Sequence, residues 1–512
     1  MLIKTFSSAV YGIKATTITI EVNISSGTQY FIVGLPDSAI KESTFRVESA
    51  LHSIGFRMPR QKIVINMAPA DIKKEGSAYD LAMAVGILAA SGQIKGDKLD
   101  QYLLLGELSL DGSLQAIRGA LSIALQAQQE GFKGIVLPAI NAREAAVVDD
   151  LEVYGFDNIR DVIAFVNEER LFHRVSVDMK HEFLNHANNY DNDFADVHGQ
   201  ENIKRALEIA AAGGHNVILI GPPGAGKTML AKRLPSILPP LSLSESLETT
   251  KIHSVAGKML ASGSLMTVRP FRAPHHTVSD VALVGGGGNP QPGEISLAHN
   301  GVLFLDELPE FKRSVLEVLR QPLEERQITI SRAKLTVDYP ASFMLIASMN
   351  PCPCGYYNHP DKDCVCSPGH VQRYLSKVSG PLLDRIDLHV EVTPVNFQEL
   401  TVKQHVESSN AIRERVITAR EVQERRFKGE DQIHNNAQMD TKRVRELCKI
   451  DASGQALLKT AMERLGLSAR AYDRILKVAR TIADLDECPD IEPQHLAEAI
   501  HFRSLDREAW AG

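Results

Sequence analysis

Hydrophobic and polar residues follow three different patterns along the chain, and each pattern predicts a different kind of structure. Near the N-terminus, the period-two stretch 16–22 predicts a strand, and the apolar stretch 81–88 predicts a core helix. Further on, the apolar runs 217–220 and 343–349 are typical of buried strands. Beyond about residue 396 the apolar spacing is helical, and β-branched runs are almost absent. The sequence therefore predicts two α/β regions followed by an all-α region.

Changes in these patterns give the expected domain boundaries. A chain of 512 residues is too long for one ordinary hydrophobic core, so several domains are expected. The first α/β domain is predicted over residues 1–165, and an irregular polar stretch at 166–192 is interpreted as a linker. The second α/β domain is predicted over 193–395 and the helical domain over 396–512.

Composition and charge narrow the class of protein. A hydrophobic content of 44% and a charged content of 23% are normal for a soluble globular protein. The net charge of -7 means that any contact with nucleic acid depends on local basic features. The sequence has neither an apolar run long enough to span a bilayer nor a secretory signal at its start. A cytoplasmic protein without membrane contact is expected.

A glycine-rich loop between a predicted strand and a predicted helix carries the strongest functional signal. Such a loop directs backbone N–H groups toward one point, where they can bind phosphate. Lys227 would reach the outer phosphates of ATP, and the Thr228 hydroxyl would hold Mg²⁺. Glycine-rich loops are common, but the strand before and the helix after this one favour nucleotide binding. The loop comprises Gly221, Pro222, Pro223, Gly224, Ala225, Gly226, Lys227 and Thr228.

Two carboxylates follow the apolar run 301–305. Asp306 is suited to hold Mg²⁺ through water, and Glu307 is suited to polarise the water that attacks ATP. The alternative is a solvated acidic pair at the end of a strand. Downstream of a phosphate loop, this arrangement favours ATP hydrolysis over binding alone.

Polar residues that follow later elements extend the same site. Asn350 ends an apolar run and could hold the attacking water, and Arg385 precedes another predicted strand. The order of these elements resembles that of the AAA+ ATPases. The resemblance implies that Asn350 is the first sensor, that Arg385 is the arginine finger of a neighbouring subunit's site, and that Arg470 is the second sensor in a helical lid. Each arginine alone could instead form a surface salt bridge, and Arg373 is a weaker candidate for the finger.

Several motifs point to one branch of these ATPases. They are Arg269–Thr277, the glycine run Gly285–Gly288, Pro292-Gly293-Glu294 and Asn350–Gly355. Together they resemble the magnesium-chelatase-like YifB/ComM family over essentially the whole chain. The resemblance implies a hexameric ring helicase that binds single-stranded and branched DNA. In that family the activity promotes branch migration when single-stranded DNA is integrated during natural transformation and recombination.

Two segments are candidates for contact with DNA in the centre of such a ring. The first is the segment 268–293, which carries Arg269 and Arg272. The second is a predicted hairpin over 327–337, with Arg332 and Lys334 near its tip. Cations there would follow phosphates without reading base sequence. The alternative is an ordinary exposed hairpin with solvated charges.

Four of the six cysteines form two closely spaced pairs. Four thiolates in a reducing compartment match a structural Zn²⁺ site, although C-x-C spacing is tighter than the usual C-x-x-C. The alternative is a loop of free thiols. The predicted ligands are Cys352, Cys354, Cys364 and Cys366.

The N-terminal domain raises a rival function, because residues 1–165 resemble the Lon-protease-type α/β domain. Active domains of that type use a serine–lysine dyad, and the resemblance puts Ala78 and Leu121 at the two positions. Without nucleophile and base the domain is expected to be a non-proteolytic scaffold. Two alternatives to a DNA translocase therefore remain: a chelatase-type motor acting on a non-DNA partner, and a Lon-like protease.

Overall fold

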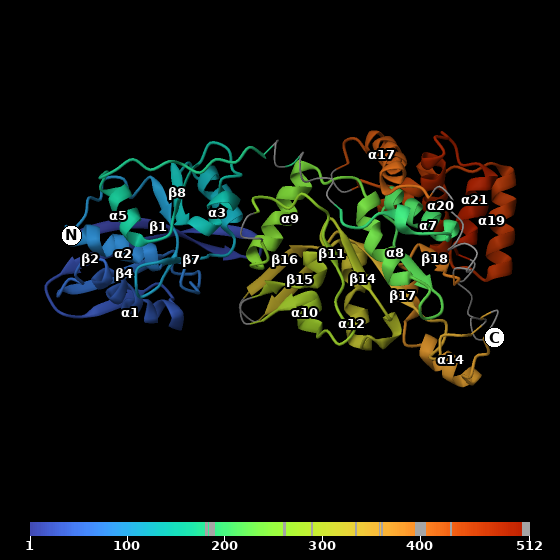
Figure 1. The fold of residues 1–512 in the computed structure, drawn as a ribbon, viewed down its shortest axis with the longest axis horizontal. Helices are drawn as coiled ribbons and strands as arrows, with labels where there is room; N and C mark the ends of the chain where they lie inside the picture. The colour runs from blue at the N-terminus through green and yellow to red at the C-terminus, as the bar shows by residue number, and fades with distance from the viewer. Residues whose placement is uncertain are drawn as a thin grey trace. The chain divides into compact units, whose positions relative to one another are not determined.

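The computed structural model describes residues 1–179, 183, 190–259, 263–287, 290–332, 335–357, 359, 362–394, 406–430 and 433–503. The chain folds into two compact units (Figure 1). The first contains Met1–His186, Ser242–Thr267 and Pro290–Pro292. The second contains Ala187–Leu241, Val268–Asn289 and Gly293–Gly512. Residues 242–267, which lie in the second α/β region of the sequence, thus fold with the N-terminal unit.

A seven-stranded mixed sheet forms the centre of the first unit, in the order β3-β4-β2-β1-β5-β8-β9. Strand β2 pairs antiparallel with both β1 and β4, whereas β1–β5, β5–β8 and β8–β9 are parallel pairs. Along β2, fully buried Ile18, Ile20 and Val22 alternate with partly exposed residues, as the period-two pattern predicts. The strands are β1 (Leu2–Tyr11), β2 (Lys14–Ser25), β3 (Tyr30–Val33), β4 (Lys62–Ala68), β5 (Tyr102–Leu104), β8 (Gly134–Pro138) and β9 (Glu152–Phe156).

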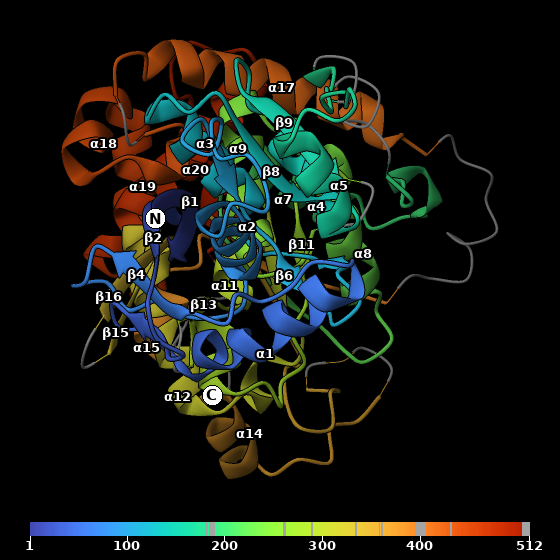
Figure 2. The same cartoon turned by 90° about the vertical axis from the view of Figure 1, so that its left-hand side faces the viewer.

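Helices cover this sheet (Figure 2). Helix α2 is buried along its whole length and packs on β1 and β2, which confirms the predicted core helix. Gly86 permits this contact, because a Cβ there would lie 2.8 Å from Val22 Cγ2. Helix α9 packs on α3, and the buried Glu144 carboxylate accepts hydrogen bonds from Leu121 N and from Ser254 of α9. The elements are α1 (Ser38–Ser53), α2 (Asp80–Ala90), β6 (Glu107–Leu108), β7 (Leu114–Gln115), α3 (Ala120–Gln129), α4 (Ala139–Ala145), α5 (Ile159–Val166) and α9 (Leu243–Val255).

The second unit is built on a five-stranded sheet in the order β11-β14-β17-β10-β18. All neighbouring strands are parallel, and β10, β14 and β17 are buried throughout. Continuous apolar runs are typical of parallel strands covered on both faces. The carboxyl ends of these strands lie at one edge, where ligands of open parallel sheets bind. The strands are β10 (Val217–Ile220), β11 (Phe271–Arg272), β14 (Val302–Leu305), β17 (Met344–Met349) and β18 (Leu388–Glu391).

Short helices and a hairpin surround this sheet. The predicted hairpin is present as β15 (Gln327–Arg332) and β16 (Leu335–Pro340), paired antiparallel. The helices of this part are α7 (Glu201–Gly213), α8 (Lys227–Arg233), α10 (Asp280–Val284), α11 (Glu294–Leu297), α12 (Arg313–Val318), α13 (Arg320–Glu325), α14 (Pro368–Leu375) and α15 (Gly380–Leu383).

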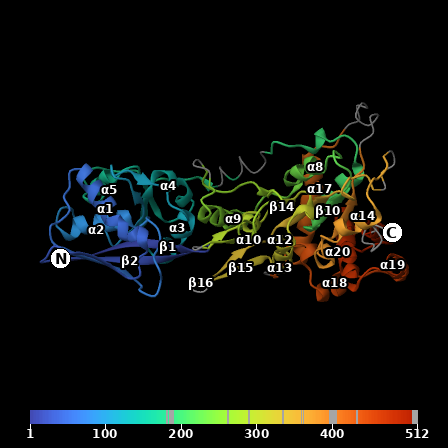
Figure 3. The same cartoon turned by 90° about the horizontal axis from the view of Figure 1, so that it is seen from below.

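The C-terminal part of the second unit is helical, as the sequence predicts (Figure 3). Helix α20 packs against α7, α17 and α21, so the helical part and the parallel sheet share one hydrophobic core. Among the described residues, no helix is both long and apolar enough to cross a membrane. The helices are α17 (Ser409–Arg426), α18 (Thr441–Leu447), α19 (Ala452–Leu465), α20 (Ala469–Leu485) and α21 (Pro493–His501).

Candidate nucleotide-binding site

The glycine-rich loop connects the end of β10 to the start of α8. Gly224 and Gly226 have φ angles of +79° and +85°, in the left-handed region that glycine adopts without strain. A Cβ on Gly221 would lie 2.2 Å from the carbonyl oxygen of Val392, so this residue also has to be glycine. The tight turn between strand and helix therefore explains three of the glycines in the sequence motif.

The Lys227 side chain turns back over this loop. Its Nζ donates hydrogen bonds to the carbonyl oxygens of Gly221 and Pro222, at 2.7 and 2.9 Å, and to Asn350 Oδ1 at 3.0 Å. Burial lowers the pKa of the Lys227 ammonium, and the carboxylates of Asp306 and Glu307 partly oppose this shift. The three oxygens that contact the ammonium are neutral, so a phosphate group would supply the missing negative charge.

Thr228, at the start of α8, contacts Asp306, which directly follows β14. Thr228 Oγ1 donates a hydrogen bond of 2.7 Å to Asp306 Oδ2. The other carboxylate oxygen of Asp306 accepts from the backbone N–H of Glu307 at 3.0 Å and from the Ser348 hydroxyl. These donors fix the direction of the carboxylate. Ser348 was not identified from the sequence, although a polar residue inside the apolar strand β17 was a usable signal.

Glu307 has an unusual backbone conformation and a partner that the sequence did not reveal. Its φ angle is +54°, in a region that residues other than glycine rarely adopt. Backbone outliers of this kind cluster at functional sites. The carboxylate is half exposed, and its Oε2 lies 3.5 Å from His276 Nδ1. His276 in turn packs on His275 and on the edge of Phe311, with ring centroids 4.1 and 6.4 Å away.

The structure thus brings five of the predicted residues to one edge of the parallel sheet. Lys227 contacts Asn350, Thr228 contacts Asp306, and Glu307 follows Asp306 directly. They offer an ammonium, a hydroxyl, two carboxylates and an amide in a single region. This set of groups can bind a polyphosphate, a divalent cation and a water molecule.

The predicted arginine finger, Arg385, is held within its own chain. Its side chain is only 9% exposed, and its guanidinium pairs with Glu324 on α13. It also donates a hydrogen bond of 2.5 Å to the carbonyl oxygen of Pro381. Arg373, the weaker candidate, is exposed and donates to the carbonyl oxygen of Gly369 on its own helix.

Arg470 lies at the start of α20, and its side chain is 70% exposed. Its Nη1 is 3.6 Å from Asp384 Oδ2. The deeper link between α20 and the sheet comes instead from Arg474, which pairs with the buried carboxylate of Asp387. Although burial favours the neutral acid, the Arg474 guanidinium and the His215 ring hold the pKa of Asp387 well below its usual range. An ionised Asp387 therefore anchors the helical part to the edge of β18.

Two of the candidate DNA-binding arginines have partners inside the fold. Arg269 donates to the carbonyl oxygens of Pro239 and Asn300, at 2.6 and 2.7 Å. Arg272 forms a bidentate pair with Glu294, at 2.6 and 2.8 Å. The backbone register pairs Arg332 with Leu335 at the end of the hairpin, whereas Lys334 lies outside the described residues.

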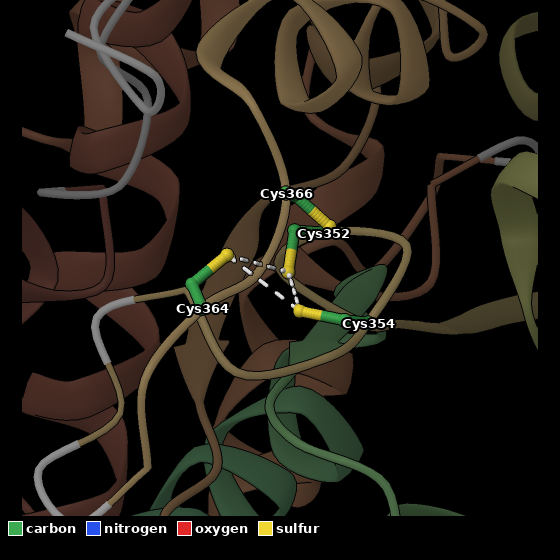
Figure 4. Close-up of side chains that lie close together, drawn as sticks. All are labelled: Cys352, Cys354, Cys364 and Cys366. Carbon is green, nitrogen blue, oxygen red and sulfur yellow. Dashed lines mark hydrogen bonds between the residues drawn. The ribbon is translucent and has the colours of Figure 1, made fainter.

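The four clustered cysteines come together in one loop (Figure 4). The Sγ atoms of Cys352, Cys354, Cys364 and Cys366 all lie within 4.8 Å of one another. Cys352 and Cys354 follow Asn350 at the end of β17, and Cys366 precedes α14. The loop is therefore part of the same sheet edge as the nucleotide site.

In the first unit, the two positions that matter for a Lon-type dyad carry apolar side chains. Ala78 packs at the edge of a hydrophobic cluster, and Leu121 is fully buried within it. The neighbouring Ser77 hydroxyl donates to the Glu107 carboxylate. A carboxylate partner differs from the lysine that a serine–lysine dyad needs.

Comparison with known protein families matches most of the chain to magnesium-chelatase families. Residues 193–400 match the family described as magnesium chelatase, subunit ChlI. Residues 20–141 match the family described as subunit ChlI of Mg-chelatase, and 406–503 match the ChlI C-terminal family.

Two individual relatives are similar to this chain over almost their full length. The YifB protein of Escherichia coli (strain K12) is 45% identical over 98% of this chain and 96% of its own length. The competence protein ComM of Haemophilus influenzae is 44% identical over 98% of this chain and 97% of its own length. The magnesium-chelatase 38 kDa subunit of Rhodobacter capsulatus is more distant, at 25% identity over 31% of this chain and 50% of its own.

Proposed function

Because the chain belongs to the YifB/ComM family of magnesium-chelatase-like AAA+ proteins, we propose that it hydrolyses ATP and uses the energy to move DNA. The observation that carries the ATPase proposal is the pair of contacts Lys227–Asn350 and Thr228–Asp306 at the edge of the parallel sheet. Together these contacts bring the phosphate loop, the acidic strand end and the polar end of β17 into one site.

Lys227 is the residue that would bind the β- and γ-phosphates. Its ammonium is buried against neutral oxygens, and the charged carboxylates of Asp306 and Glu307 act on it only from a distance. A polyphosphate would therefore supply a direct negative partner. The backbone N–H groups of the loop from Gly221 to Gly226 would bind the remaining phosphate oxygens. Bound ATP would thus offset the free-energy cost of burying the charged lysine without a direct negative partner.

Thr228 and Asp306 fit a Mg²⁺ site, because hydroxyl and carboxylate oxygens are the ligands that this cation prefers. When bound, the cation would neutralise negative charge on the phosphates. Asp306 is held for this task by the Glu307 N–H and by the Ser348 hydroxyl.

Glu307 is proposed as the general base that accepts a proton from the attacking water. Its carboxylate is half exposed and can therefore reach a water beside the γ-phosphate. Asn350 would hold that water with its amide N–H group, since its Oδ1 is already bound to Lys227. His276 would hold the Glu307 carboxylate in place until ATP binds.

The proposed enzyme is a homo-oligomer, with a hexameric ring as its expected form. In it, Arg385 would act on the neighbouring subunit's ATP and Arg470 would act as the second sensor of the lid. For Arg385 this role requires its pair with Glu324 to open or to rotate toward the neighbour. Arg470 is exposed and is free to move from its long contact with Asp384.

Single-stranded and branched DNA are the proposed partners, and branch migration during the integration of single-stranded DNA is the proposed activity. The name of the competence protein ComM supports a link to DNA uptake. Since Arg269 and Arg272 are bound within the fold, the hairpin carrying Arg332 and Lys334 is the better candidate for contact with phosphates. We propose a cytoplasmic location, which agrees with the finding that none of the six cysteines, all among the described residues, forms a disulfide bond.

A chelatase-type motor with a non-DNA partner is the second candidate. It is favoured by the match of residues 193–400 to the magnesium chelatase family. Strand displacement from a branched DNA substrate separates the two functions. The ATP-dependent displacement should occur with the wild-type protein and be lost in Lys227→Ala. Displacement that is absent from the wild type under conditions where it hydrolyses ATP would favour the non-DNA motor.

A further inference from the structure

The cysteine loop has the composition and the geometry of a metal site. Its two C-x-C pairs are separated by nine residues, and the structure brings all four sulfur atoms within 4.8 Å of one another (Figure 4). The ligand set contains only thiol groups. Such a set favours Zn²⁺ over the hard cations Mg²⁺ and Ca²⁺, which prefer oxygen.

The distances between the sulfur atoms fit a tetrahedral centre. The Sγ atom of Cys352 is 3.3 Å from that of Cys354 and 3.7 Å from that of Cys364. The sulfur atoms of Cys354 and Cys364 are 3.6 Å apart. A zinc–sulfur bond of about 2.3 Å gives a tetrahedron with edges of about 3.8 Å, whereas a disulfide bond is only about 2.05 Å long. The sulfur atoms are thus arranged as ligands of a common centre.

A backbone N–H group also points at one of these sulfur atoms. Gly355 N donates to Cys352 Sγ at 3.2 Å. Donors of this kind stabilise the negative charge of metal-bound thiolates and orient the ligands.

The cysteine loop touches the phosphate loop. A Cβ on Gly355 would lie only 2.4 Å from Pro223 Cδ, which shows how closely the two loops pack. Asn350, which binds Lys227, is two residues before the fully buried Cys352. The position of the cysteine loop therefore determines the position of groups in the nucleotide site.

We propose that Cys352, Cys354, Cys364 and Cys366 bind one structural Zn²⁺, and that this metal holds Gly355 and Asn350 against the phosphate loop. The metal part stands on the sulfur geometry alone. The second part rests on the proposed ATP site, because it concerns the loop that would bind the phosphates.

The first experiment measures metal content. The full-length protein, purified under reducing conditions, is expected to contain about one zinc per chain by inductively coupled plasma mass spectrometry. The double variant Cys364→Ser/Cys366→Ser should lose most of it, whereas Cys488→Ser, a free cysteine outside the cluster, should keep it. If the double variant does not fold, Cys366→His replaces it and should retain zinc, because histidine is also a zinc ligand.

Three results would overturn the metal site. They are wild-type protein with little or no zinc after incubation with ZnCl₂, protein that contains iron in place of zinc, and disulfide bonds among the four cysteines in mass spectrometry. Retention of zinc by the double serine variant would overturn the ligand assignment.

The second experiment tests the contact between the two loops while leaving the ligands intact. Gly355→Ala places a methyl group against Pro223, so zinc should be retained and ATP affinity should fall about tenfold or more. Gly429→Ala is the matched control, since Gly429 also has a positive φ angle, +95°, but no atom near its Cβ position. Equal ATP affinity in the two variants would overturn the coupling. If the wild-type protein binds no ATP at all, the proposed function fails, and the zinc content still decides the metal site.

Discussion

Lys227 Nζ on α8 donates a hydrogen bond of 3.0 Å to Asn350 Oδ1 at the end of β17. The two residues are far apart in the sequence. Lys227 comes after β10 and Asn350 comes after β17, and these two strands are parallel neighbours in the sheet. This contact joins the group proposed to bind the γ-phosphate to the group proposed to hold the attacking water. Because the two side chains are hydrogen-bonded, phosphate binding to Lys227 would directly affect the Asn350 side chain.

Replacement of the loop lysine should abolish tight ATP binding. A charge-assisted hydrogen bond contributes about 1.5–3 kcal/mol, so Lys227→Ala should weaken ATP binding roughly 10-fold to 100-fold. Isothermal titration calorimetry with ATP and Mg²⁺ measures this change. Lys232→Ala is the matched control, because Lys232 lies on the same helix and is exposed. Equal weakening in both variants would contradict the role of Lys227.

Removal of the proposed general base should stop turnover but not binding. Glu307→Gln keeps the size of the side chain, and the loss of general-base catalysis typically lowers kcat about 100-fold to 10,000-fold. ATP affinity should change little. The control is Glu310→Gln, since the Glu310 carboxylate lies nearby and pairs with Lys377 at 3.4 Å. Normal hydrolysis by Glu307→Gln would exclude Glu307 as the base.

The histidine beside Glu307 should have a smaller effect. A partly exposed contact between polar side chains contributes about 0–1 kcal/mol, so His276→Ala should change kcat by no more than about fivefold, with ATP affinity nearly unchanged. His275→Ala removes the stacked neighbour but not the contact of 3.5 Å with Glu307. Steady-state kinetics of the two variants separate these contributions. A larger loss in His275→Ala than in His276→Ala would show that stacking, and not the contact with Glu307, matters.

The buried carboxylate of Asp387 should make stability depend on pH. Its pKa is lower in the folded chain than in the unfolded chain, where an aspartate has a pKa of about 3.9. Its contribution to the free energy of unfolding is therefore complete above that pH and is lost as the pH falls further. The variant Asp387→Asn leaves Arg474 without its buried charged partner. The free energy of unfolding at pH 7 should therefore fall by about 3–5 kcal/mol.

Thermal unfolding at pH 7 and at low pH tests this expectation. The difference in unfolding temperature between wild type and Asp387→Asn should be large at pH 7 and should shrink in acid. Asp384→Asn is the control, because its contact with Arg470 is exposed and long, at 3.6 Å. A pH-independent difference would mean that Asp387 stabilises the fold through its shape and not its charge.

Much of the geometry of the candidate nucleotide site was predictable because its signals are local. The glycines at 224 and 226 are needed by a turn within the loop itself, and Asp306 and Asn350 directly follow apolar strands. The clustering of the four cysteines was likewise indicated by their spacing, and the structure confirms it. Strands and short loops of this kind are predictable because their apolar periodicity and their turn-forming residues lie within the element itself.

Other features depend on tertiary packing and could not be predicted from local sequence. The contact of His276 with Glu307 joins two distant segments, and the pair of Arg385 with Glu324 joins α13 to the segment before β18. Helix α9 follows the phosphate-loop helix in sequence but packs on α3 of the first unit. Its capping box at Ser242 and Glu245 predicts where the helix begins. The local sequence does not indicate which hydrophobic core the helix packs against.

The decisive experiment measures ATP hydrolysis by the purified protein with and without single-stranded DNA. We expect Mg²⁺-dependent hydrolysis that increases several-fold when DNA is added and that is lost in Lys227→Ala. A wild-type protein that hydrolyses no ATP in either condition, or a Lys227→Ala variant that hydrolyses it at the wild-type rate, would contradict the proposed ATPase function.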